Sequence, residues 1–419
     1  MANTEGGIST IANKAPPKSF LSAESHATST VAVHADDILN ASADVAPALH
    51  VSTTFRYASN PDDLVSTRDL KGPLPNDTHI YSRHTAPNST RLETILQPLL
   101  HAPCCTYSSG LAAVHAAYVF LKPRVIANGC GYMGCQGVID MHQKLTGAKV
   151  VGLDCAPEEL GKGDVVHLET PFNPTGEAVS IRKYAEKAHA QGAYLLVDST
   201  FGPPGLQEPF GLGADMVMHS GTKYLGGHSD MLCGVLAAQR DDWVKTLREE
   251  RTYLGSVMGN MEGWLGVRSL RTLGLRVERQ SANAEKLVNW LYSSLHRESP
   301  DDENASGKVV QKGVMEVQHA SLQHKDMEWL KEQMPNGFGS VFAITMQTED
   351  LARKLASRTK LFHHATSLGS VESLIEWRAM SDKMIDRRLV RVSVGIEAYE
   401  DLKEDLLSAF KSLTDGSAE

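Results

Sequence analysis

The chain is 419 residues long, and at about 150 residues per domain this length favours two or three domains. Hydrophobic residues make up 42% of the sequence and charged residues 22%, which excludes a disordered, collagen-like or rod-shaped coiled-coil protein. The formal net charge of −9 argues against nucleic acid or an anionic membrane as a partner.

The sequence carries no pattern of export or of a membrane anchor. No stretch approaches 18 uninterrupted apolar residues, and residues 1–20 lack both an apolar signal core and an Arg-rich transit-peptide pattern. We therefore expect a cytoplasmic protein. The six cysteines include no CxxC pair and no zinc-type spacing, so we expect reduced thiols that serve packing, and no metal site.

The first half of the chain predicts an arm followed by an α/β domain. Residues 1–46 are rich in Ala, Ser, Thr and Pro and predict an extended arm, and residues 58–79 predict a polar loop. From there to about residue 240, short apolar strands alternate with amphipathic helices. The expected strands are 106–109, 124–129, 148–154, 164–170, 193–200 and 214–220. Such strands predict a doubly wound, mostly parallel sheet covered on both faces.

The second half predicts a long helix and a smaller α/β domain. Residues 264–297 carry apolar side chains at three- and four-residue spacing, with Gly274 as a candidate break. A polar loop at 298–307 precedes shorter strands at 341–346 and 390–395, with helices at 349–358 and 399–411. We therefore divide the chain into residues 1–78, 79–280 and 281–419.

The segment HSGTKYLGGHSD, residues 219–230, is the most informative stretch. It follows an apolar strand, and ligands of open parallel sheets bind beyond the carboxyl ends of the strands. Partial burial would lower the pKa of the Lys223 amine, and a neutral amine forms Schiff bases with carbonyls. Taken alone, a lysine in such a loop is more often a solvated one than a nucleophile.

Asp198 ends another predicted strand, and its presence favours a chemical role for Lys223 over a solvated loop lysine. A carboxylate there can pair with a ring nitrogen and keep it protonated, as pyridoxal phosphate requires, although a helix cap is the plain alternative. Lys223 and Asp198 together favour a pyridoxal-phosphate site in the crevice of the sheet.

Seven segments in the same order resemble the cystathionine γ-synthase and lyase family. The family comprises pyridoxal-phosphate enzymes of cysteine and methionine metabolism, with the aspartate-aminotransferase-like fold of type I. The segments are YSR (81–83), SSGLAA (108–113), ETPFNPTG (169–176), DSTF (198–201), SGTKYLGGHSD (220–230), SLGSVESLI (367–375) and VRVSVGIE (390–397). The resemblance implies a large cofactor domain at 79–280, a small domain at 281–419 and an oligomer-contact segment within 1–78.

The resemblance also assigns roles at the cofactor. Lys223 matches the Schiff-base lysine, which then moves protons among Cα, Cβ and the cofactor. Asp198 matches the partner of the pyridine nitrogen, and Tyr132 matches the ring-stacking tyrosine that can protonate the leaving group. The remaining implied cofactor contacts are Tyr81, Arg83, Ser109, Gly110, Leu111, Asn173, Thr200, Ser220 and Thr222.

On the substrate side, Arg391 matches the arginine that grips the α-carboxylate, and Asn173 and Ser367 match neighbours of that group. Tyr81 and Arg83 match residues that reach the phosphate from a neighbouring subunit. The resemblance therefore implies a dimer with shared sites, commonly paired into a homotetramer.

Three segments depart from the family pattern. YSRHTAPNST is two residues longer than usual over 84–90, MGNMEG (258–263) replaces a Ser-Pro-Phe-Asp segment, and EWRAMSD (376–382) lacks the usual Pro and Thr-His pair. These segments border the substrate entrance in relatives, so they leave the substrate open.

The expected reaction is γ-replacement on an O-acyl-L-homoserine such as O-acetylhomoserine, through a vinylglycine-type ketimine. Ser367 favours it, because β-specific relatives tend to carry Trp there. The nucleophile could be cysteine, sulfide or an enolate carbon, and a cystathionine β- or γ-lyase is the alternative. A dinucleotide oxidoreductase is disfavoured because the Gly-x-Gly of 211–215 precedes a strand. A purely structural paralogue is disfavoured because Lys223, Asp198 and Arg391 are all present.

Overall fold

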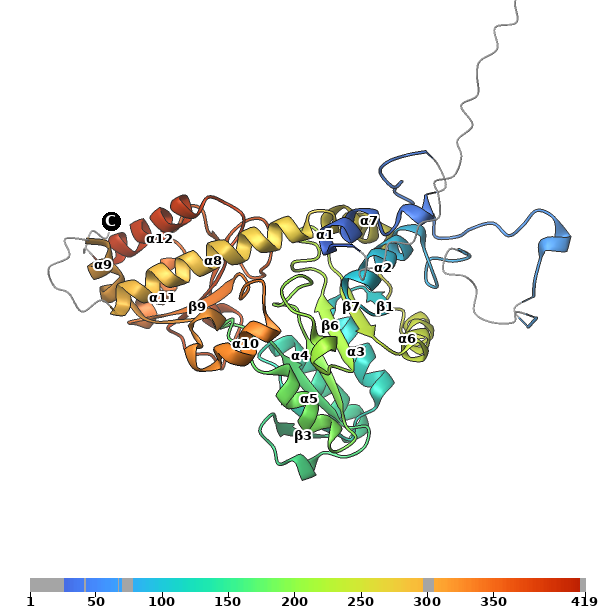
Figure 1. Ribbon diagram of the computed structural model, residues 1–419, viewed down its shortest axis with the longest axis horizontal. Coiled ribbons are helices and arrows are strands. Elements are labelled where there is room, and N and C mark those ends of the chain that lie inside the picture. Colours follow the sequence, from blue (N-terminus) through green and yellow to red (C-terminus); the bar gives the residue numbers. More distant parts are fainter. Residues whose placement is uncertain (1–25, 41–42, 67, 70–77, 297–304, 415–419) are drawn as a thin grey trace, which may run out of the picture.

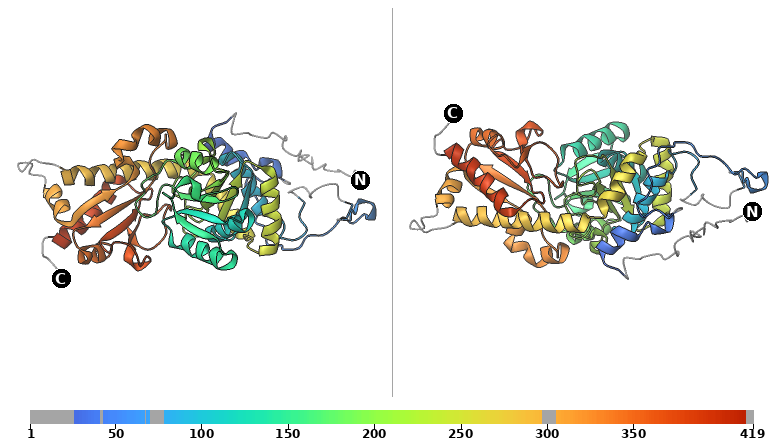
Figure 2. Two further views of the ribbon diagram at one scale, coloured as in Figure 1. Left: turned by 90° about the horizontal axis from the view of Figure 1, so that it is seen from below. Right: turned by 90° about the horizontal axis from the view of Figure 1, so that it is seen from above.

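The computed structural model describes residues 26–40, 43–66, 68–69, 78–296 and 305–414. The molecule is elongated, with a large sheet and a small sheet side by side along its long axis (Figures 1 and 2). Helix α8 (Leu273–His296) runs from the large-sheet region along the small sheet. Residues 43–66 reach away from the large-sheet end as a loop.

The large sheet has seven strands, six of which run in one direction. Strand β7 alone among them is antiparallel to both of its neighbours. The spatial order is β1 (Cys104–Tyr107), β7 (Gly234–Ala238), β6 (Met216–Ser220), β5 (Tyr194–Asp198), β4 (Val165–Glu169), β2 (Val125–Gly129) and β3 (Lys149–Gly152). The fold is the expected mostly parallel α/β arrangement.

Helices cover both faces of this sheet, and alternation along the strands explains why. In β5, Leu196 packs on the side of α3 (Gly110–Leu121), α4 (Met133–Thr146) and α6 (Asp241–Leu254). Its neighbour Leu195 packs on the opposite side, against α5 (Ile181–His189). Both leucines are fully buried, and each such side chain contributes about 1.5–3 kcal/mol relative to exposure.

The small sheet carries its own core. Its five strands lie in the order β10 (His363–His364), β11 (Leu374–Trp377), β12 (Leu389–Ser393), β9 (Val341–Met346) and β8 (Val314–Gln318). The helices in this part of the chain are α8, α9 (Ala305–Gly313), α10 (Met327–Gln333), α11 (Glu349–Leu355) and α12 (Tyr399–Thr414). Phe342, Val392 and Phe410 are fully buried between sheet and helices.

Two local expectations were wrong. Residues 28–34 form helix α1 with Val31 buried, whereas we expected an extended arm; residues 1–25 lie outside the described residues. The helix predicted over 264–297 is two helices, α7 (Asn260–Leu270) and α8. The break falls at residues 271–272, where the Arg271 side chain donates to the Val33 carbonyl at 2.7 Å, and Gly274 lies inside α8.

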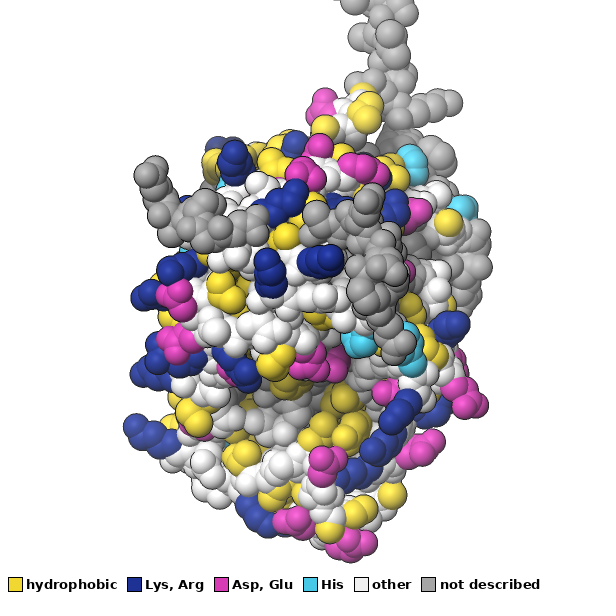
Figure 3. Space-filling model, turned by 90° about the vertical axis from the view of Figure 1, so that its left-hand side faces the viewer, with side chains coloured by type: hydrophobic (Ala, Val, Ile, Leu, Met, Phe, Trp, Pro, Cys, Tyr) yellow, Lys and Arg dark blue, Asp and Glu magenta, His cyan; other side chains and the backbone are white. Residues whose placement is uncertain are grey.

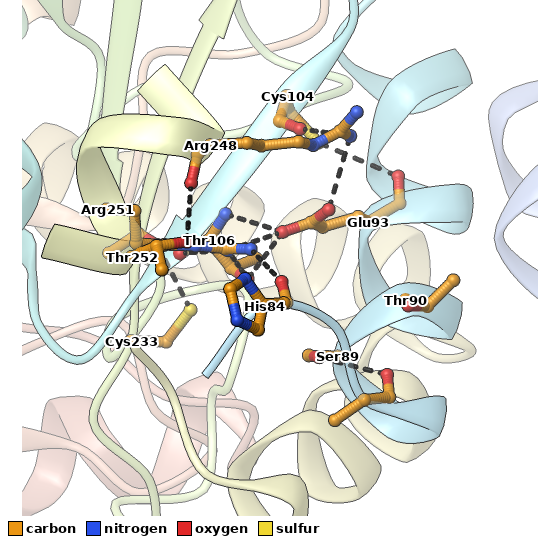
Figure 4. Close-up of polar contacts among 12 residues, drawn as sticks. His84, Ser89, Thr90, Glu93, Cys104, Thr106, Cys233, Arg248, Arg251 and Thr252 are labelled. Atoms are coloured by element: carbon orange, nitrogen blue, oxygen red, sulfur yellow. Dashed lines mark hydrogen bonds and ion pairs between the residues drawn. The ribbon is translucent and has the colours of Figure 1, made fainter. Parts of the chain in front are cut away.

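A buried ion cluster joins α2 (Pro87–Leu99), α6 and β1 (Figure 4). The Glu93 carboxylate accepts hydrogen bonds from Arg251 at 2.9 Å, Arg248 at 3.2 Å and the Thr106 hydroxyl at 2.8 Å. Arg251 also reaches the carbonyl of His84 at 3.3 Å. The cluster therefore fixes the chain just after the YSR segment.

On the small-sheet end of the molecule, basic and acidic side chains intermingle and apolar ones are scattered among them (Figure 3). That distribution agrees with the absence of a basic excess in the sequence. Within the described part of the chain, each helix is too short or too polar to cross a membrane.

Candidate active site

A cavity of about 570 Å³ opens at the carboxyl ends of the parallel strands. Lys223 and Asp198 line it from the large-sheet side, and Ser367 and Arg391 line it from the small-sheet side. The cavity is thus built by both halves of the molecule, at the edge where parallel sheets bind ligands.

Lys223 lies in the loop after β6 and points into this cavity. Its Nζ donates a hydrogen bond to Ser367 Oγ at 2.7 Å. Burial, with a further contribution from the Arg391 charge, lowers the pKa of Lys223 to about 8. A substantial fraction of the amine is therefore neutral near physiological pH, which is the form that attacks a carbonyl or accepts a proton.

Asp198 and Glu169 end adjacent strands and face each other across the β4–β5 pairing. Burial raises the pKa of both carboxyl groups, and the Asp198 charge adds to the rise at Glu169. Asp198 accepts a hydrogen bond from the Thr200 backbone N–H at 3.0 Å, which leaves most of its acceptor capacity for a cationic partner.

Glu169 is a residue whose role the sequence did not indicate. Its carboxylate accepts from three backbone N–H groups, those of Gly131 at 2.9 Å, Tyr132 at 3.0 Å and Asn173 at 2.8 Å. It therefore fixes the two loops that carry Tyr132 and Asn173. Its position at a strand end, level with Asp198, was the available signal.

A candidate anion-binding site lies at the start of α3. Ser109 caps the helix and accepts from the Ala112 N–H at 3.1 Å, and Gly110 is its first residue. A Cβ on Gly110 would lie 3.0 Å from the Ser220 Cβ, so only glycine permits this approach without displacement. Leu111, Ser220 and Thr222 also line the cavity. A helix N-terminus with hydroxyl groups beside it suits a phosphate.

Arg391 is held by a buried network. It donates to Asn173 Oδ1 at 3.0 Å, to the Ser367 carbonyl at 2.9 Å and to Glu376 Oε2 at 2.7 Å. Arg378 donates to the same Glu376 oxygen at 2.9 Å. Arg378 also lines the cavity, so the segment 376–382, which departs from the family pattern, contributes directly to the site.

Most of the expected site residues meet in this cavity: Ser109, Gly110, Leu111, Tyr132, Asn173, Asp198, Thr200, Ser220, Thr222, Lys223, Ser367 and Arg391. Tyr81 and Arg83 do not line it in the single chain. The Tyr81 side chain is exposed, and the Arg83 guanidinium lies 5.4 Å from the centre of its ring. Arg83 also donates to the Thr252 carbonyl at 3.4 Å.

Comparison with known proteins decides the family. Residues 29–411 match the model of the Cys/Met metabolism PLP-dependent enzyme family. The chain belongs to this family.

Relatives in the Cys/Met metabolism family carry different reaction names. The chain is 33% identical to the chloroplastic cystathionine beta-lyase of Arabidopsis thaliana, over 83% of this chain and 76% of the relative. It is 31% identical to the cystathionine gamma-synthase of Escherichia coli, over 89% and 94%. The crystal structure of yeast cystathionine gamma-lyase superimposes with a TM-score of 0.78 at 29% identity, covering 92% of this chain and 98% of that one.

Pyridoxal 5′-phosphate is the cofactor of this family, and the cavity fits it. The buried Asp198 carboxylate has spare acceptor capacity for a protonated ring nitrogen. The glycine-lined start of α3, with Ser220 and Thr222, suits the phosphate. The partly neutral Lys223 amine suits the aldehyde carbon.

Proposed function

We propose that the chain catalyses γ-replacement on an O-acyl-L-homoserine, with cysteine, sulfide or a carbon nucleophile replacing the acyl group. The observation that carries the proposal is the contact between Lys223 and Ser367. A small side chain beside the lysine leaves space for the amine to reach two neighbouring carbons of one substrate. A bulky aromatic side chain at this position would fill that space.

γ-Replacement demands a base that serves both Cα and Cβ. The proton on Cα leaves first, then a proton on Cβ, and the acyl group departs from Cγ as a carboxylate. The bound cofactor supplies the carbonyl and the conjugated ring that take up the electrons of the broken Cα–H bond. Lys223 is the group placed to accept and return these protons, because its pKa of about 8 lies near the working pH.

The other side chains orient the substrate. Arg391 offers a planar guanidinium for the α-carboxylate, and Asn173 is already hydrogen-bonded to it at 3.0 Å. Tyr132 lines the cavity and is half-exposed, so its hydroxyl can approach the leaving acyl oxygen. Burial raises the pKa of Tyr132, which favours the protonated phenol that a proton donor needs.

We also propose a dimer with shared sites, paired into a homotetramer, in which Tyr81 and Arg83 reach the phosphate site of a neighbouring subunit. In support, residues 43–66 project from the single chain with Val45, Val51 and Tyr57 exposed at 91%, 83% and 69%. Apolar side chains at that exposure gain free energy when a second copy covers them. We propose as well that the chain divides into three parts at residues 78 and 280, and that the protein is located in the cytoplasm.

The alternative is cystathionine β- or γ-lyase activity, which the names of several relatives favour. A product assay by mass spectrometry separates the two. The holoenzyme is given O-acetyl-L-homoserine with cysteine, sulfide or a β-keto acid, and cystathionine alone in a fourth reaction. Lys223→Ala, which removes the base, is the control for each.

A new γ-substituted amino acid that depends on Lys223 would support the proposal and identify the nucleophile. Pyruvate with homocysteine, or 2-oxobutyrate with cysteine, from cystathionine alone would replace it with a lyase.

A further inference from the structure

Two cysteines and a histidine lie together beside the active-site cavity and have no part in the chemistry above. Cys130 follows β2, Cys135 lies in the first turn of α4, and His167 lies in β4. Both sulfur atoms and a ring nitrogen of His167 lie within 4.8 Å of one another. We propose that these three side chains bind a divalent cation that prefers sulfur and nitrogen ligands, with Zn²⁺ as the type ion.

His167 has the arrangement of a metal-binding histidine. It is fully buried, and its Nδ1 lies 2.7 Å from the Tyr118 hydroxyl, while its Nε2 has no hydrogen-bond partner among the described residues. An unpartnered buried polar atom is rare and calls for an explanation. Metal-binding histidines commonly use one ring nitrogen for the ion and the other for a hydrogen bond that fixes the ring. Burial also lowers the pKa of His167 to about 3, so the imidazole is neutral and its lone pair is available.

The two thiols are placed to act as a pair. The Cys130 and Cys135 sulfur atoms lie within 4.8 Å of each other, and the Cys130 thiol donates to the His167 carbonyl at 3.9 Å. Burial raises the pKa of both thiols, so they stay protonated in the absence of an ion.

Binding would balance charge inside the protein. One Zn²⁺ displaces one proton from each thiol, and two thiolates with a neutral imidazole give a complex without net charge. A neutral complex avoids the cost of a buried free thiolate. Three protein ligands leave the fourth tetrahedral position to a water molecule.

The site would also affect the active site. Cys130 and Cys135 lie on either side of Tyr132 in the chain, and Cys135 lines the catalytic cavity. A bound ion would tie the end of β2 to the start of α4, and so restrict the loop whose backbone Glu169 already holds.

The first test is metal content. The reduced holoenzyme is equilibrated with Zn²⁺ and dialysed, and the number of zinc ions per chain is measured by inductively coupled plasma mass spectrometry. We expect one Zn²⁺ per chain, lost in Cys130→Ser and in Cys135→Ser. Cys155→Ser is the matched control, because Cys155 is also a free, half-buried cysteine but lies outside the cluster; it should keep the ion. Equal zinc content in all four proteins would overturn the proposal.

The second test needs no variant, in case a serine variant does not fold. Alkylation rates of Cys130 and Cys155 are compared by peptide mass spectrometry with and without Zn²⁺. Zn²⁺ should slow alkylation of Cys130 at least tenfold and leave Cys155 unchanged. Unchanged alkylation of Cys130 would overturn the proposal. So would a disulfide between Cys130 and Cys135, if the protein took up no Zn²⁺ after that disulfide was reduced.

Discussion

Replacing Glu376 with Gln should destabilise the protein strongly, because this one carboxylate serves two buried guanidiniums. Its Oε2 lies 2.7 Å from Arg391 and 2.9 Å from Arg378, and the three side chains are only 4–5% exposed. Burial alone would raise the pKa of Glu376, but the two guanidiniums and Ser381 hold it below its ordinary value. Removing one partner of a buried ion pair costs about 3–5 kcal/mol. We expect a loss of that size in the free energy of unfolding of the Glu376→Gln holoenzyme.

The control is the same chemical change at an exposed pair. Glu349 contacts Arg387 at 2.7 Å, with side chains 44% and 64% exposed. Exposed pairs contribute about 0–1 kcal/mol, so Glu349→Gln should shift the urea midpoint only slightly. The double variant Glu376→Gln with Arg378→Met removes one of the two guanidiniums that lose their contact with Glu376. Its loss should be smaller than the sum of the two single losses by about 0.5–3 kcal/mol.

The same variants test how the substrate α-carboxylate is bound. Glu376 holds Arg391, and Arg391 is the proposed ligand of the α-carboxylate. A displaced guanidinium should raise KM for the amino-acid substrate about tenfold, equivalent to ~1.4 kcal/mol, with a smaller effect on kcat. The reasoning is refuted if Glu376→Gln unfolds at the wild-type urea concentration, or if the two substitutions are strictly additive.

Three further predictions follow from the site. The rate at which the apoenzyme recovers absorbance with pyridoxal phosphate should rise with pH through about 8, because Lys223 reacts as the neutral amine; a midpoint near its ordinary value of 10.5 would contradict this. Burial lowers the pKa of His319 to about 4 from 6.5, so the unfolded chain takes up a proton first and Tm should fall as pH drops below 6.5; His319→Gln should flatten that fall, and an unchanged slope would contradict it. Mixing Arg83→Ala with Lys223→Ala subunits should restore some activity through hybrid sites; none in verified mixed dimers would exclude the shared site.

Much of the site was predictable because parallel strands end at one edge. Asp198, Ser220 and Lys223 each follow an apolar run, and apolar runs can be recognised locally. Once the runs are accepted as neighbouring parallel strands, their polar ends must meet in space. No long-range information is needed for that step. Their meeting in one cavity agrees with this reasoning.

For Arg391, the resemblance indicated Asn173 and Ser367 as neighbours, but the contacts with Glu376 and Arg378 could not be predicted from the local sequence. Arg391 contacts Asn173, which is 218 positions away in the chain, and Glu376, which is 15 positions away. Nothing in the local pattern around Glu376 distinguishes a buried carboxylate from an exposed one. Strand β7 was missed because GVLAA is short and weakly apolar, and its antiparallel place between β1 and β6 is a property of the whole sheet.

Glu169 and Asp198 mark the boundary between what local pattern can and cannot assign. Both are acids at the ends of adjacent buried strands, and the sequence alone treats them alike. The hydrogen-bond donors around each carboxylate distinguish the two acids. Glu169 has three backbone N–H donors, which occupy its oxygens and fix two loops, whereas Asp198 has one backbone donor and keeps oxygen lone pairs free. Burial and the Asp198 charge raise the pKa of Glu169 most, so Asp198 is the acid of the pair that keeps its negative charge. Asp198 is therefore the carboxylate suited to a protonated ring nitrogen, while Glu169 fixes the loops that carry Tyr132 and Asn173.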